Sequence, residues 1–92
     1  MLNQVMLVGS IALLPVATNS GKKDTAYRFS MMVDEDEEFS VNIYIWPGLA
    51  NAIIEKYHLG DMVAVKGSLQ MTNDGYLIVV AEKVSFITTK ED

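Results

Sequence analysis

One short stretch of the chain alternates between aliphatic residues and residues that could bind a ligand. It runs Val-Asn-Ile-Tyr-Ile-Trp over residues 41–46. Successive side chains of a strand point to opposite faces, so Asn42, Tyr44 and Trp46 would share one face and the aliphatic residues the other. An amide and two aromatic rings on one exposed face can bind a flat ligand. Asn42, Tyr44 and Trp46 are therefore the first candidates for a binding site.

Catalytic chemistry has little support in the residue types. His58 is the only histidine and the chain has no cysteine, so the usual pairing of a nucleophile with a base is missing. His58 falls at the end of a predicted helix, where the helix dipole favours a cation, and we predict a structural role for it. The acidic run Asp34–Glu38 could bind a metal only through carboxylates, and its spacing does not match an EF-hand loop. We predict no catalytic residue, no metal site and no cofactor.

The charge balance argues against general binding to polyanions. Seven basic and twelve acidic residues give a net charge of −5, whereas contacts to phosphates need clustered Lys and Arg. The composition leaves room for one locally basic face. The basic residues are scattered along the chain: Lys22, Lys23, Arg28, Lys56, Lys66, Lys83 and Lys90.

The length and composition predict one small folded domain. We expect a single core over residues 1–88, with 89–92 as a frayed C-terminus. Half of the residues are hydrophobic, which is too many for a disordered chain. No apolar run reaches the roughly 18 residues of a membrane span, and the apolar start lacks the basic leader of a signal peptide. The absence of cysteine is compatible with a reducing cytoplasm.

Hydrophobic periodicity predicts five strands and one helix. Pro15–Asp24 is read as a loop because of its turn residues, and Asn73-Asp74-Gly75 predicts a tight hairpin. Gly60 is expected to end the helix, and Asp34–Glu38 to form a solvated hairpin tip. The strands are expected at 2–12, 25–33, 41–46, 62–71 and 76–87, and the helix at Leu49–His58.

The order β-β-β-α-β-β predicts the fold. It is the layout of the OB-fold, an all-β, five-stranded Greek-key barrel with one helix between strands 3 and 4. From the number of strands alone, a split α+β domain with a sheet and one helix would compete with it.

The chain also resembles the bacterial single-stranded DNA-binding protein (SSB) family along nearly its whole length. The opening strand Met1–Gly9, the second-strand segment Phe29–Val33 and the closing segment Ala81–Phe86 are similar to the corresponding strands of that family. The most specific part of the resemblance is the series Trp46, Leu49, Ala50, Tyr57, Gly60, Asp61, Val63, Val65, Gly67 and Leu69. The resemblance implies an OB-fold, single-stranded DNA (ssDNA) binding without sequence preference, and assembly as a homo-oligomer. It implies roles in DNA replication, repair or recombination.

On this hypothesis, bases stack on Trp46 and Tyr44, since stacking on an aromatic ring accepts any base. Asn42 would hydrogen-bond a base or a phosphate. Tyr27 and Tyr76 are weaker candidates for lining the groove. The predicted contacts to phosphates are Arg28, Lys22, Lys23 and Lys66. The alternative is that Trp46 packs over the helix start, that Tyr44 lies in a subunit contact, and that the polar and charged side chains are simply solvated.

Several departures from the family pattern support a second hypothesis. Ser10 stands where the family has a basic residue, and Ser40 where it has an aromatic one, with Phe39 one residue away. The hairpin Asp34–Glu38 is acidic, the hairpin at Asn73–Gly75 is short, and the family's acidic C-terminal tail is absent from the sequence. A protein-interaction module that has lost most of its DNA affinity would explain these changes, with 34–38 as a contact for a basic partner.

The first strand predicts self-association in either case. Leu2, Met6 and Val8 alternate with Val5 and Leu7, so both faces of the strand are apolar. A small barrel buries only one of them, and the other should meet a second subunit. The sequence leaves open whether a dimer or a tetramer forms.

Overall fold

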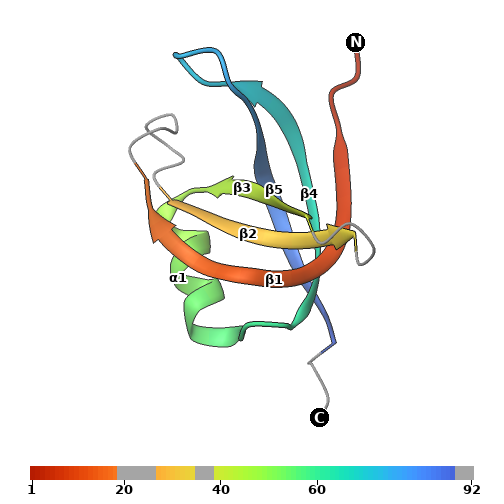
Figure 1. The fold of residues 1–92 in the computed structure, drawn as a ribbon, viewed down its shortest axis with the longest axis vertical. Helices are drawn as coiled ribbons and strands as arrows, with labels where there is room; N and C mark the ends of the chain where they lie inside the picture. Colours follow the sequence, from red (N-terminus) through yellow and green to blue (C-terminus); the bar gives the residue numbers. More distant parts are fainter. Residues whose placement is uncertain (19–26, 35–38, 89–92) are drawn as a thin grey trace.

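The computed structural model describes residues 1–18, 27–34 and 39–88, and shows a closed β-barrel with one helix (Figure 1). The order of strands around the barrel is β1-β2-β3-β5-β4. The elements are β1 (Val5–Ala17), β2 (Tyr27–Asp34), β3 (Phe39–Ile45), α1 (Pro47–Lys56), β4 (Met62–Met71) and β5 (Leu77–Thr88). The predicted order β-β-β-α-β-β and the OB-fold are confirmed. No helix in these described residues is long and apolar enough to cross a bilayer.

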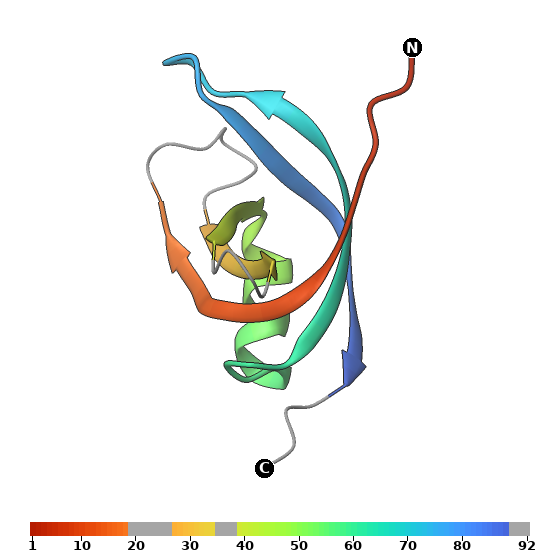
Figure 2. The same ribbon diagram turned by 45° about the vertical axis from the view of Figure 1, so that its right-hand side comes forward.

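The barrel closes where β3 lies parallel to β5. Strand β3 pairs with β5 at Ile43–Val79 and Tyr44–Val80, whereas all other neighbouring strands are antiparallel. The hairpin of β4 and β5 extends beyond the other strands at the end away from α1 (Figure 2). The first half of β3 and the extended hairpin therefore border an opening at that end of the barrel.

The core is built from the aliphatic positions that the alternation predicted to point inward. Phe29, Met31, Ile43 and Ile45 are fully buried, as are Val63 and Val65 of β4. The helix covers one end of this core with Ala50 and Ile53. Val5, Leu7, Val33 and Val41 pack against the core from strand positions nearer the ends. The inward direction predicted for Val41, Ile43 and Ile45 is thus confirmed.

At two glycine positions, neighbouring strands approach each other too closely to leave room for a side chain. A Cβ atom on Gly9 would overlap the carbonyl oxygen of Met32, and one on Gly67 would overlap the carbonyl oxygen of Val80. Gly67 lies where the β4–β5 register shifts by one residue. Such a shift bends the strand, as a small barrel requires. A glycine inside a strand often marks such a close approach of two backbones.

Several boundaries differ from the predicted ones, and three of these differences have a clear local cause. Strand β1 continues to Ala17 and contains Pro15, which the sequence assigned to a loop. A proline is tolerated there because the β1–β2 register shifts between Leu13 and Val16, so its missing N–H leaves no ladder bond broken. The helix begins at Pro47, the favoured first position for proline. It ends at Lys56, so Gly60, with φ of 88°, belongs to the following turn rather than to the helix end.

Candidate nucleic-acid interface

The outer face of β2 and β3 carries a row of polar and aromatic residues. Arg28 lies opposite Tyr44 and Ser30 opposite Asn42 in the antiparallel register. Phe29 and Ile43, which alternate with them, are fully buried in the core. The local sequence pattern therefore fixes which side chains face outward, and the sheet register brings residues of two strands together. We call this surface, made of Arg28, Ser30, Asn42, Tyr44 and Trp46, the outer β2–β3 face.

Asn42 is hydrogen-bonded to both of its neighbours on β2. The hydroxyl of Ser30 donates to Asn42 Oδ1 at 2.8 Å, and Nη1 of Arg28 donates to the same oxygen at 3.4 Å. Ser30 is nearly buried, whereas Asn42 is exposed. The pair of bonds holds the amide in one orientation on the outer β2–β3 face.

Trp46 is the exposed aromatic residue of this face. It directly precedes α1 at the N-cap position and makes no side-chain cap hydrogen bond. Its indole lies beside Gly48 in the first turn of the helix. Even so, 42% of the residue is exposed, so a base has ring surface to stack on. The two sequence interpretations of Trp46, a stacking platform and a cover over the helix start, are therefore compatible.

Tyr44 points outward as the alternation predicted, but it is only 7% exposed. It packs with Ile78 and Val80 in a small second cluster outside the main core. The parallel pairing of β3 with β5 places Val80 directly beside it. A buried ring offers little surface for stacking, so Trp46 is the more exposed of the two residues predicted to stack.

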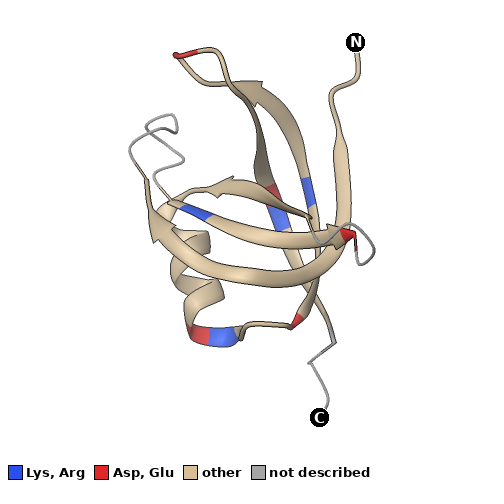
Figure 3. Cartoon of the chain, in the orientation of Figure 1, with Lys and Arg blue, Asp and Glu red and all other residues tan. Residues whose placement is uncertain are grey.

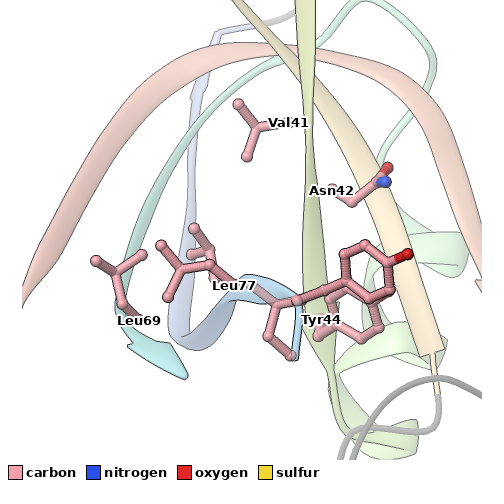
Figure 4. A pocket seen from close by; sticks show the side chains of 8 residues that line it. Val41, Asn42, Tyr44, Leu69 and Leu77 are labelled. Atoms are coloured by element: carbon pink, nitrogen blue, oxygen red, sulfur yellow. The ribbon is translucent and has the colours of Figure 1, made fainter. Parts of the chain in front are cut away.

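A cleft of about 350 Å³ opens next to Asn42, between the first half of β3 and the β4–β5 hairpin (Figure 4). Asn42 and Tyr44 lie on one side of it, with Leu77 and Leu69 across from them. Tyr76, 68% exposed, also lines the cleft. Its volume is at the lower end of the range for sites that bind small organic groups. The remaining lining residues are Val41, Ile78 and Val79.

Comparison with known proteins gives matches in structure and none in sequence. No family model matches the chain, and no curated protein sequence matches it. The mitochondrial single-stranded DNA-binding protein Rim1 from S. cerevisiae superposes with a TM-score of 0.73 at 17% identity, over 98% of this chain and 100% of Rim1. The SSB domain of a Synechococcus protein gives 0.68 at 14% identity, over 92% and 96%.

A deletion mutant of the single-stranded DNA-binding protein from Thermus aquaticus gives a TM-score of 0.72 at 25% identity. It is matched over 99% of this chain, which spans 43% of that protein. The fold is the SSB-type OB-fold. The resemblance inferred from the sequence is thereby confirmed at the level of the fold. The three structures are described as single-stranded DNA-binding proteins or an SSB domain.

The OB-fold does not bring all predicted basic residues to the outer β2–β3 face. Lys66 of β4 lies opposite Lys83 of β5, next to Met6 of β1. Figure 3 shows these two basic positions side by side, apart from the basic position of β2. Lys22 and Lys23 lie outside the described residues, as does most of the run Asp34–Glu38. Within the described ranges, Arg28 is the one basic residue of the outer β2–β3 face.

The sequence did not identify Ser30 or the apolar wall of the cleft as parts of the site. Ser30 was not a candidate, and its bond to Asn42 follows from the β2–β3 register. Leu69 and Leu77 come from the extended hairpin, whose path over β3 is a tertiary feature. Tyr76, a weaker candidate, reaches the cleft. Tyr27 instead packs against the core. Alternation alone indicated faces and could not indicate these cross-strand neighbours.

Proposed function

We propose that the protein binds single-stranded DNA without sequence preference along the outer β2–β3 face. The observation that carries the proposal is the exposed residue Trp46 directly after β3, together with Asn42 and Arg28 on the outer face of an SSB-type barrel. Stacking on an aromatic ring accepts every base, and Arg28 supplies a cation for the phosphates. The proposal includes a role in DNA replication, repair or recombination, and a place in the cytoplasm, with which a chain free of cysteine is compatible.

Oligo-dT is expected to quench the tryptophan fluorescence at low salt. Trp46 is the only tryptophan, so the signal comes from the proposed site. Added salt should reverse the quenching, because phosphate contacts release counterions that salt restores. A titration with unlabelled oligo-dT, followed by stepwise addition of salt to the complex, measures the quenching and its reversal. A folded protein whose fluorescence stays unchanged up to high micromolar DNA would remove the outer β2–β3 face as a DNA site.

The second candidate function is a protein-interaction module of the same fold. The observations that favour it are the net charge of −5 and the single basic residue on the described part of the outer β2–β3 face. Such a module would bind a basic protein partner through the acidic segment 34–38. An unshifted labelled oligonucleotide at low salt, combined with a partner that copurifies, distinguishes this candidate from DNA binding.

We also propose that the protein self-associates through β1. Its first half, Val5–Gly9, pairs with β4 on one side, and the recorded pairing with β2 starts only at Ser10. Met6 and Val8 are 63% and 54% exposed on the outer side of this segment. An apolar strand with an unpaired edge is a surface that a second copy covers. A dimer or a tetramer would each bury it.

Val8→Glu is expected to dissociate the oligomer, because it places a charge in the apolar contact. Sedimentation analysis should show the mass of the variant falling to the 10.2 kDa of one chain. Ile54→Glu is the matched control, since Ile54 is 48% exposed on α1. That variant should keep the mass of the wild type. A wild-type protein that sediments as a monomer at micromolar concentration contradicts the proposal.

A further inference from the structure

The orientation of the Asn42 amide follows from the chemistry of its neighbour. Arginine only donates hydrogen bonds, so the Asn42 atom that faces Arg28 Nη1 must be the acceptor oxygen Oδ1. Ser30 also bonds this atom, at 2.8 Å, and its hydroxyl can act as the donor. The two β2 side chains therefore hold the amide with its oxygen toward them.

The Nδ2 group of Asn42 bonds no acceptor in the part of the chain that the structure describes, and Asn42 is exposed. A ligand that binds here must bring an acceptor to gain a hydrogen bond. A ligand that brings another donor would leave both groups unsatisfied, which costs binding free energy.

The cleft beside Asn42 indicates which acceptor it is. Its far wall is aliphatic, with Leu69, Leu77 and Ile78, and it offers no charged side chain among the described residues. A phosphate would lose its hydration in such a place without compensation. A base ring would gain from apolar contact, while its phosphates stay on the side of Arg28.

Building on the proposed function, we infer that Asn42 donates a hydrogen bond from Nδ2 to an acceptor atom of a base whose ring enters this cleft. Thymine offers its carbonyl oxygens and adenine its ring nitrogens as acceptors, so either base can accept this bond. Stacking on Trp46 is also indifferent to the base, so both contacts are compatible with binding of any sequence. Thymine is the base used in the test, because an isostere can remove its acceptors.

The test is a thermodynamic cycle between the Asn42 side chain and the carbonyl groups of the base. Short oligo-dT is compared with the same oligomer in which each thymine is replaced by difluorotoluene, which keeps the shape and stacking surface but is a poor acceptor. Affinities are measured by quenching of Trp46 for the wild type and for Asn42→Ala. The wild type should bind oligo-dT about two- to tenfold more tightly than the isostere, and Asn42→Ala should lose this ratio.

Two further variants and one modified oligonucleotide serve as controls. Asn42→Asp keeps the size of the side chain and removes both donors, so it should lose the ratio as well. Asn51→Ala alters an exposed asparagine on α1 and should keep it. Methylphosphonate-linked oligo-dT tests the phosphate as the alternative source of the acceptor. If Asn42→Ala lowers the affinity for the difluorotoluene oligomer but not the affinity for methylphosphonate-linked oligo-dT, Asn42 binds a phosphate and the inference is wrong.

The remaining outcomes separate the inference from the proposed function. If the wild type and Asn42→Ala bind oligo-dT and show the same ratio, the base readout is wrong while DNA binding stands. If the folded wild type binds neither oligomer, the proposed function is wrong and the inference is overturned with it. Circular dichroism shows whether each variant is folded.

Discussion

Gly67→Ala is expected to destabilise the barrel by about 3 kcal/mol or more, the upper end of the usual cost of overpacking. The added Cβ would overlap the carbonyl oxygen of Val80, which is backbone and has no rotamer to change. Relief requires the β4–β5 crossing to separate. Because β5 also pairs with β3 at Val79 and Val80, the separation would disturb the seam that closes the barrel.

Urea denaturation followed by circular dichroism measures this effect. Marginal stability is usual for a small domain, so a loss of this size should lower the urea midpoint by about 1 M or more. Gly48→Ala is the control, because its Cβ would have an ordinary contact of 3.6 Å with Trp46 Cδ1. Alanine suits a helix better than glycine, so this variant should be at least as stable as the wild type. If Gly67→Ala unfolds at the same urea concentration as the wild type, the close approach of β4 and β5 at Gly67 is contradicted.

The strand faces could be predicted from the sequence because they depend only on local alternation. Phe29, Met31, Ile43 and Ile45 lie in the core as their spacing required. The order of elements then sufficed for the OB-fold. The end of β1 could not be predicted, since Pro15 is tolerated only because of a register shift against β2. A sequence shows which residues break a ladder but not where the ladder is already interrupted.

In the candidate site, too, some features could be predicted from the sequence and others could not. The outward direction of Asn42 and Tyr44 follows from alternation, and the structure has both on the predicted face, whereas Trp46 follows β3 as the N-cap residue of α1. Their exposure does not follow, because Tyr44 is covered through contacts with Ile78 and Val80 of a strand distant in sequence. The position of Lys66 opposite Lys83 likewise depends on the β4–β5 pairing. The direction of a strand side chain depends on its own strand, whereas its burial depends on neighbours that only the tertiary fold brings near.

Trp46→Ala is expected to weaken binding to oligo-dT about 5- to 150-fold, the equivalent of roughly 1–3 kcal/mol for one stacked base. The variant lacks the fluorescent probe, so the anisotropy of a labelled oligonucleotide at low salt is the measurement. Trp46→Phe keeps a smaller ring and should lose less affinity. The fold should remain intact, because Trp46 makes no cap hydrogen bond to α1 and is 42% exposed.

The salt dependence of these variants separates stacking from charge. Trp46→Ala removes no cation, so the slope of log Kd against log salt should equal that of the wild type even as affinity falls. Arg28→Gln should instead reduce the slope by about 0.7, the value for one phosphate contact on a single strand. A smaller slope in Trp46→Ala would mean that the indole positions the strand for phosphate contacts. Unchanged affinity in a folded Trp46→Ala variant would contradict stacking at this site and favour the protein-interaction module.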